Sequence, residues 1–209
     1  MTAPKNLVDF FQIAEKLECE PRLTRTSDDQ PQSVASHSWN MAMMAMTIHP
    51  YLHNDVDMGR VLELCILHDL PEAIAHDTPL HEQTPQVKEQ KRINEQSAID
   101  TINTLLQNER IEHNFNEYES RQTPESRLVK SLDTLDACLQ HLCACDLSYI
   151  GTYDDNFYWK AFFSDSFAAR FDYEPILRHI YNEMRERVAV RLQQELNIDY
   201  KDYTKDESQ

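Results

Sequence analysis

The scarcity of glycine constrains the fold of this chain more than any other feature. Only 2 glycines occur among its 209 residues, Gly59 and Gly151. Tight turns and phosphate-cradling loops usually need glycine, because glycine adopts positive φ angles without steric cost. A Rossmann-type dinucleotide fold is therefore excluded, and long helices are favoured over turn-dense β architectures.

Apolar residues recur at helical spacing through most of the chain. We expect a single all-α domain over residues 1–209, with its core at about 7–196 and a flexible tail at 197–209. Ser33 or Ser36 is expected to cap the second helix and Asp57 the third. The polar stretch 20–31 predicts a loop, and the segment 149–171 predicts one short helix. The longer helices are predicted at about 5–18, from the serine cap to 52, 58–74, 86–107, 125–147 and 174–196.

Charge and cysteine content limit the partners of the chain. Its formal net charge is −16, from 20 basic and 36 acidic residues, so its surface repels nucleic-acid backbones and no nucleic-acid polymer is expected as a partner. No apolar run reaches transmembrane length and no signal peptide is recognisable, so no membrane association is expected. The 5 cysteines, mostly within helical patterns, indicate reduced thiols in the cytoplasm.

His68 and Asp69 follow directly after an apolar run, residues 61–67. Burying two such side chains is unfavourable unless something pairs with them, and a bound cation would do so. Glu72 lies one helical turn further on, so that on a continuous helix all three would share one face. Such a site suits at least one Mn, Co, Fe, Mg or Zn ion, which would polarise a phosphoryl oxygen, with Glu72 as general base.

Three more residues on other predicted helices are candidate metal ligands. His37 stands in the second helix, and Asp133 and Asp136 stand in the helix at 125–147. Helical phase places Asp136 nearer the leucine stripe of that helix than Asp133. The residues alone therefore leave both Asp133 and Asp136 open as the last ligand. The metal site would lie between central helices of the bundle.

A phosphate substrate also needs positive charge near the metal. Lys88, Lys91 and Arg92 at the start of the fourth helix would supply it, with Lys88 as the chosen substrate-binding residue. Their alternation with glutamates is equally typical of a solvated helix face. The loop arginines Arg22 and Arg25 precede the histidine helix, and either is also typical of a loop arginine paired with a carboxylate.

These motifs together resemble the HD-domain metal-dependent phosphohydrolases. The similarity is greatest to the 5′-deoxynucleotidase (YfbR-like) family and its eukaryotic relatives, and the phage HD-domain dATP triphosphohydrolases are also similar. It covers about residues 7–145 and is carried by four segments, Ser33–Ser38, His68–Ala73, Asp77–Pro79 and Val129–Asp133.

The resemblance assigns roles to individual residues. It implies that His37, His68, Asp69 and Asp133 are the metal ligands and that Glu72 activates water. Asp77 would be a further catalytic residue that contacts substrate, and Arg22 would face the phosphate.

Two positions depart from the family pattern. Leu23 stands where the bacterial nucleotidases have a tryptophan beside the sugar, and His76 replaces the usual glycine before Asp77. Both side chains are therefore candidate substrate-binding residues, and His76 is also a candidate ligand for another metal or an ordinary surface histidine.

The activity implied by the resemblance is hydrolysis of deoxyribonucleoside 5′-monophosphates to deoxynucleoside and phosphate. The alternative with the same fold and metal is a dNTP triphosphohydrolase. Two other classes are a non-catalytic HD scaffold and a di-iron oxygenase, which would need further histidines such as His113 and His141. The family resemblance also implies a homodimer.

Overall fold

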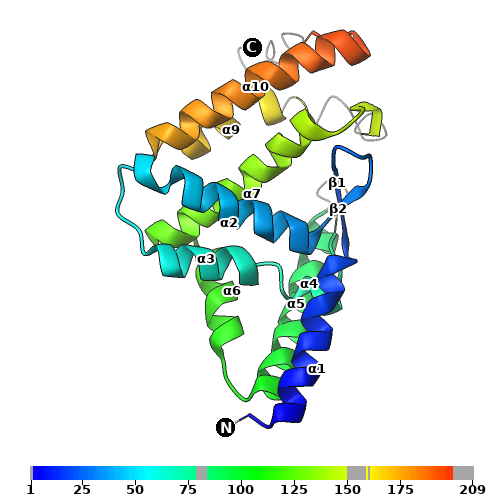
Figure 1. Ribbon diagram of the computed structural model, residues 1–209, viewed down its shortest axis with the longest axis vertical. Helices are drawn as coiled ribbons and strands as arrows, with labels where there is room; N and C mark the ends of the chain where they lie inside the picture. The colour runs from blue at the N-terminus through cyan, green and yellow to red at the C-terminus, as the bar shows by residue number, and fades with distance from the viewer. Residues whose placement is uncertain (1, 79–83, 150–158, 160, 200–209) are drawn as a thin grey trace.

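The computed structural model describes residues 2–78, 84–149, 159 and 161–199. These residues are mostly helical, which confirms the predicted all-α class (Figure 1). No helix among them is both long and apolar enough to cross a membrane. The helices, in chain order, are α1 (Pro4–Glu15), η1 (Lys16–Glu18), α2 (Val34–Ile48), η2 (His49–Tyr51), α3 (Met58–Leu67), α4 (Glu72–Ala75), α5 (Pro85–Leu106), α6 (Arg110–Ser120), α7 (Pro124–Cys143), α9 (Asp165–Ala168), η5 (Ala169–Phe171) and α10 (Pro175–Leu196).

Side-chain caps start the two helices that carry the candidate histidines. The Ser33 hydroxyl accepts a hydrogen bond from the Ser36 amide at 3.1 Å, so Ser33 is the cap of α2. The Asp57 carboxylate accepts from the amides of Gly59 and Arg60 and caps α3, as predicted. Each cap satisfies amide groups that have no partner within the helix.

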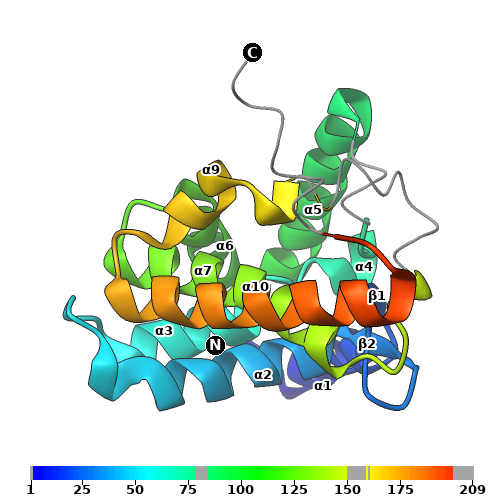
Figure 2. The same cartoon turned by 90° about the horizontal axis from the view of Figure 1, so that it is seen from above.

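The central helix α7 packs against α2, α3, α6 and α10. Figure 2 shows α10 lying across α7, with α2 and α3 beneath it. The main core forms among these helices, and Leu64, Leu132 and Leu135 are fully buried in it. The apolar face of the last helix packs into this core through Leu177 and Leu192, so that face is used within the chain itself.

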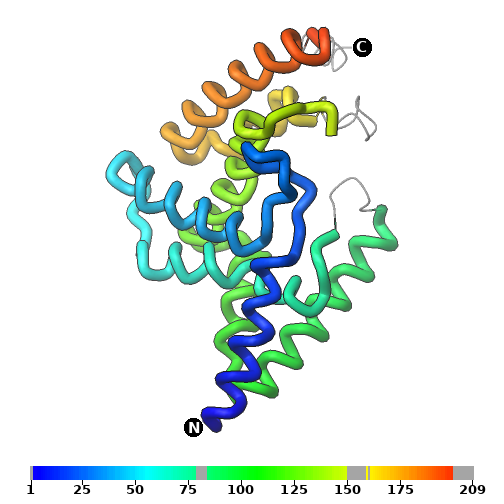
Figure 3. Tube along the Cα trace, turned by 45° about the vertical axis from the view of Figure 1, so that its right-hand side comes forward, coloured from blue at the N-terminus to red at the C-terminus, as the bar shows by residue number. Residues whose placement is uncertain are grey.

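A second, smaller core lies under α1, α4 and α5, where Leu17, Leu70 and Ile102 meet. In Figures 1 and 3, α1 and α5 run side by side away from the main core. The segment that joins α3 to α4 runs between the two cores, and it contains His68 and Asp69.

The prediction of one continuous helix at 58–74 is wrong, because this segment forms two helices separated by a turn. The α-helix α3 ends at Leu67, and α4 begins only at Glu72. Pro71 disfavours helical geometry in the residue before it, and tight turn bonds replace the helical ones, as from the Leu70 amide to the Leu67 carbonyl at 3.2 Å. Asp69 therefore lies on a turn, and Glu72 does not share a continuous helix with His68.

The predicted loop at 20–31 contains part of a β-hairpin instead. Its strands β1 (Pro21–Arg25) and β2 (Pro31–Ser33) pair antiparallel. The strands are too short for an alternating pattern to stand out in the sequence. The helix α6 was also not predicted, because its mostly polar residues bury only Ile111, Asn114 and Tyr118.

Two predicted segments extend beyond the described residues. One short helix was predicted within 149–171, but besides α9, which η5 continues, residues 159 and 161–163 are also helical, so the prediction of a single helix is wrong. Residues 150–158 and 160 are not described. Of the tail at 197–209, positions 200–209 lie outside the described part of the chain.

Candidate metal centre

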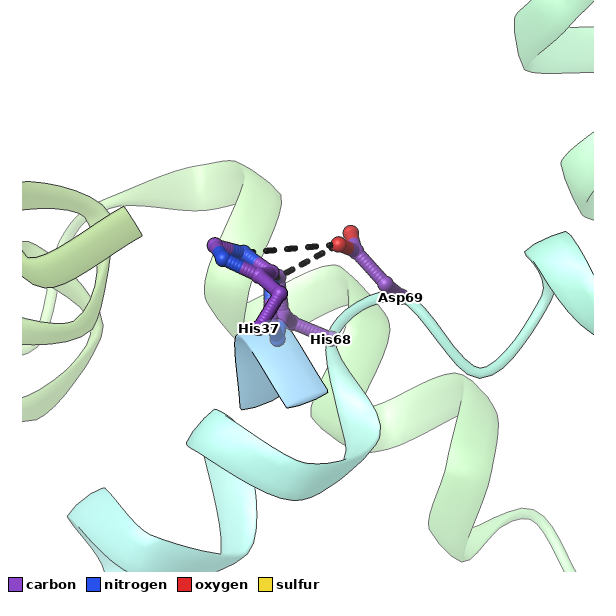
Figure 4. Close-up of side chains that lie close together, drawn as sticks. All are labelled: His37, His68 and Asp69. Atoms are coloured by element: carbon purple, nitrogen blue, oxygen red, sulfur yellow. Dashed lines mark ion pairs between the residues drawn. The ribbon is translucent and has the colours of Figure 1, made fainter. Parts of the chain in front are cut away.

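Two buried histidines and one aspartate come together from three segments. His37 is in α2, His68 directly follows α3, and Asp69 lies on the next turn. One ligand atom from each lies within 4.8 Å of the others (Figure 4). Asp69 Oδ2 is 3.1 Å from His68 Nε2 and 3.7 Å from His37 Nε2. No other such group of three is found among the described residues.

The hydrogen bonds that each histidine ring makes on the side away from Asp69 indicate which ring nitrogen carries the proton. The Nδ1 atom of His37 lies 2.6 Å from Asp136 Oδ2, and that of His68 lies 3.1 Å from the Cys65 carbonyl oxygen. Both partners are acceptors, so each Nδ1 carries the proton and each Nε2 presents a lone pair. Both Nε2 atoms are buried and make no hydrogen bond within the described chain. Two lone pairs facing a carboxylate oxygen require a cation or a proton between them.

Asp133 and Asp136 lie on opposite sides of the His37 ring. Asp133 Oδ1 is 3.2 Å from Nε2, the nitrogen that faces Asp69, whereas Asp136 contacts Nδ1. Burial and Arg22 act to lower the pKa of His37, but the neighbouring carboxylates of Asp133 and Asp136 outweigh them and raise it. For Asp133 itself burial acts to raise the pKa, yet Lys130, His37 and Arg22 hold it well below its usual range.

Arg22 reaches this group from strand β1. Its guanidinium Nη1 lies 3.2 Å from Asp69 Oδ2, and Nη2 lies 3.7 Å from Asp133 Oδ1. The guanidinium fork is suited to binding a phosphate through two parallel hydrogen bonds. The hairpin therefore places a guanidinium beside the carboxylates of Asp69 and Asp133.

A second ionic cluster adjoins the first. The Glu72 side chain is buried, and its Oε1 accepts a hydrogen bond from Lys91 Nζ at 3.1 Å. Lys91 also lies 4.0 Å from Asp77 Oδ1 and 3.4 Å from Glu95 Oε1. Burial raises the pKa of Glu72 well above its ordinary value, and the charges of Asp69 and Asp77 raise it further against the opposing effect of Lys91. A raised pKa makes the ionised form of a carboxylate a stronger proton acceptor.

Comparison with known proteins identifies the family. The model of a family described as HD domain matches residues 14–172. This chain belongs to the HD-domain family. The histidine and aspartate group lies entirely within the matched region.

Similar proteins extend the comparison. The chain is 31% identical over 140 residues to a Danio rerio protein named 5′-deoxynucleotidase HDDC2, covering 65% of this chain and 68% of the relative. It is 33% identical over 153 residues to the Schizosaccharomyces pombe 5′-deoxynucleotidase hdd1, covering 67% and 74%. A crystal structure of a predicted metal-dependent phosphohydrolase from Magnetospirillum magnetotacticum has the same fold, with a TM-score of 0.71 and 24% identity over 90% of this chain and 93% of that one.

The other candidate residues of this HD-domain protein differ in burial and contacts. Leu23 follows Arg22 in β1 and is half-buried. Lys88 is exposed, and it is Lys91, three residues later in α5, whose ammonium reaches Glu72. The His76 side chain is 75% exposed and its Nδ1 lies 2.9 Å from Glu20 Oε2, while Glu20 Oε1 accepts from the Asp77 amide at 3.0 Å.

Of the residues that hold the candidate ligands, the sequence singled out only Lys130, as part of the segment Val129–Asp133. Tyr118 of α6 donates its hydroxyl to Asp133 Oδ2 at 2.7 Å, and Lys130 donates to the same oxygen at 2.9 Å. Gln32 and Asn40 donate to the buried carboxylate of Asp136. The spacing of Ile111, Asn114 and Tyr118 is a helical signal that would have located α6, but nothing in the sequence marks Gln32 or Asn40.

Proposed function

We propose that this HD-domain protein is a divalent-metal-dependent 5′-deoxynucleotidase. It would hydrolyse deoxyribonucleoside 5′-monophosphates to deoxynucleosides and phosphate. The observation that carries the proposal is the pair of buried Nε2 lone pairs that face Asp69 without a hydrogen bond. The names of the similar proteins, which are 5′-deoxynucleotidases, support the choice of substrate.

The proposed metal ligands are His37, His68, Asp69 and Asp133. Imidazole nitrogens with carboxylate oxygens suit Mn, Fe, Co, Zn or Mg. The choice of Asp133 is supported by its 3.2 Å distance to the centre-facing Nε2 of His37. When bound, the ion supplies Lewis acidity, since it polarises a phosphoryl oxygen and lowers the pKa of water.

The side chains of the protein provide binding and proton transfer. Arg22 binds the 5′-phosphate oxygens. Its guanidinium pairs with the carboxylates of Asp69 and Asp133, and a bound cation would neutralise both and leave the guanidinium available. Glu72 accepts a proton from the attacking water through Oε2, which is buried and has no hydrogen-bond partner among the described residues. Lys91 holds the other oxygen, Oε1. The water oxygen bonds to phosphorus, the bond to the 5′-oxygen breaks, and the proton passes to the leaving deoxynucleoside.

Asp77, Leu23, His76 and Lys88 are proposed to shape the rest of the substrate site. Asp77 is the best placed of them, because its carboxylate is 4.0 Å from Lys91 Nζ and its amide is fixed by Glu20. Arg22 and Lys91 oppose the rise in the pKa of Asp77 that burial produces, but the pKa remains raised. These contacts support a role for Asp77 as a hydrogen-bonding carboxyl group beside the proposed phosphate site.

Product analysis tests the proposal directly. Metal-free protein reloaded with Mn²⁺ or Co²⁺ would be offered each dNMP, the matching ribonucleotides and each dNTP, and the products separated by chromatography. We expect phosphate and deoxynucleoside from dNMPs. Release of intact triphosphate from a dNTP would instead identify a triphosphohydrolase, and no turnover with any metal would refute the assignment.

Two matched substitutions separate metal binding from proton transfer. Glu72→Gln should retain the metal but lower kcat by about 10²- to 10⁴-fold, because the proton acceptor is lost. Glu95→Gln is the control, since Glu95 also contacts Lys91 at 3.4 Å but is given no catalytic role. An equal loss of kcat in both variants would mean that the ion pairs of Lys91, and not proton transfer by Glu72, account for the effect. His68→Ala should remove metal and activity together.

The assembly, compartment and domain organisation are also proposals. We propose a homodimer in the cytoplasm, with residues 1–209 as one domain. The 5 free cysteines are compatible with a reducing compartment. Light scattering coupled to size-exclusion chromatography would report the mass, cell fractionation the compartment, and a single unfolding transition the one domain.

A further inference from the structure

A buried carboxylate behind the metal centre has no role in the function proposed above. Asp136 is fully buried in α7, three residues after Asp133. Its Oδ2 lies 2.6 Å from His37 Nδ1 and accepts from Gln32 Nε2 at 2.8 Å. Its Oδ1 accepts from Asn40 Nδ2 at 3.0 Å and from Gln140 Nε2 at 3.4 Å. Donors from β2, α2 and α7 thus converge on one carboxylate.

The same hydrogen bonds continue into the hairpin that carries Arg22. The Thr24 hydroxyl donates to Gln32 Oε1 at 2.7 Å, and both residues are buried. Because its carbonyl oxygen accepts from Thr24 and its amide donates to Asp136, the Gln32 side chain is fixed in one orientation. Thr24 is two residues from Arg22 in β1. A continuous buried chain of hydrogen bonds therefore runs from the arginine strand to the His37 ring.

We infer that Asp136 is a positioning residue that acts through His37, and that Gln32 links this residue to the Arg22 hairpin. The Asp136 carboxylate keeps the His37 proton on Nδ1, so the Nε2 lone pair faces Asp69. A carboxylate behind a ligating histidine also increases the basicity of the ring and fixes its orientation. The inference rests on the proposed function only in taking His37 as a metal ligand.

Replacing Asp136 with asparagine tests the charge while preserving the shape. One oxygen becomes an amide nitrogen, which cannot accept a hydrogen bond from the donors now present at either position. We expect the affinity for Co²⁺ or Mn²⁺ to fall by about 10- to 100-fold, the range typical for loss of such a partner. The dissociation constant would be measured on metal-free protein by competition with a chelator, and the Co²⁺ absorption spectrum would report the ligand geometry.

Glu174→Gln is the matched control. Glu174 is also buried, at 1% exposure, and accepts hydrogen bonds from the amides of His53 and Asn54, away from the histidine rings. This variant should lose stability but keep the metal dissociation constant within about twofold of the wild type. A Kd for Asp136→Asn within twofold of the wild type would overturn the inference.

A second variant keeps the test decisive if Asp136→Asn fails to fold. Gln32→Met removes the amide but leaves the Asp136 charge in place. We expect it to raise the KM for dNMP more than it lowers kcat, because the Arg22 strand loses its link, and to weaken metal binding by less than Asp136→Asn. An unchanged KM and Kd would refute the link. If the wild type binds no metal at all, the proposed function fails instead, and His37→Ala would then change nothing.

Discussion

The backbone at His76 is predicted to store strain that glycine would release. His76 has φ 65° and ψ 151°, a region that essentially only glycine occupies. Of the four other described non-glycine residues with positive φ, three, Gln107, Arg121 and Asn197, have ψ between 31° and 37° and lie in the milder left-handed helical region. A conformation like that of His76 costs about 1–3 kcal/mol.

Replacing His76 with glycine would release this strain, but two effects of the same substitution oppose the gain in stability. Glycine raises the entropy of the unfolded chain, at a cost of about 0.5–1 kcal/mol. The pair between His76 and Glu20 is also lost, but its histidine is 75% exposed, so the pair is worth about 0–1 kcal/mol. We expect His76→Gly to stabilise the protein by about 1 kcal/mol, which corresponds to a rise in Tm of about 2–4 °C for a chain of this size.

His76→Ala isolates the effect of the β-carbon. It removes the same imidazole and the same contact with Glu20 but keeps the atom that makes the conformation unfavourable. Both variants would be compared with the wild type by thermal and urea denaturation of metal-free protein at pH 7.5. At an ordinary position alanine is more stable than glycine, so a glycine variant more stable than the alanine variant would identify the strain. The reasoning is refuted if alanine equals or exceeds glycine.

The metal, the core and a surface carboxylate give three more predictions. Addition of Mn²⁺ to chelator-treated protein should raise Tm in differential scanning fluorimetry. A ligand at about 100 times its Kd adds about 2.7 kcal/mol to the free energy of unfolding. An unchanged Tm would contradict a metal site. Phe171→Ala should destabilise the protein by about 3–5 kcal/mol in urea titrations. Phe171 is buried, and its ring stacks on that of Tyr181 with 4.9 Å between the ring centroids. A loss below about 1 kcal/mol would contradict that packing. The hydrogen bond from Arg110 lowers the pKa of Glu63 to about 2, against the opposing effect of burial and with help from Asn114 and Arg60. Because the folded pKa lies below the ordinary value, this stabilisation is complete above pH 4.5 and is lost as the pH falls toward 2, so wild type and Glu63→Gln should differ in stability at pH 7 and converge in acid.

Local sequence signals predicted several helices well and failed where tertiary contacts determine the backbone conformation. The predictions for α5 and α10 agree with the structure to within about one residue at each end, because apolar spacing and a proline at the first turn mark them. The continuous helix through His68 and Glu72 was wrong, although Pro71 gave a sign of the break. The hairpin was missed because its three-residue strand β2 is stabilised by pairing with β1 and by the buried Gln32.

The sequence by itself determined the helical class, the caps of the histidine helices, and the residue types that belong to a metal-dependent phosphohydrolase. Only the tertiary structure decided which nitrogen of His37 faces the centre, that Asp133 and Asp136 lie on opposite sides of its ring, and that Lys91 rather than Lys88 reaches Glu72. Helical periodicity specifies which face of a helix is buried, but not the rotation and distance of that face relative to a helix nearly a hundred residues away. Those distances are fixed by side-chain packing between α2, α3 and α7, and the chemistry of the site depends on them.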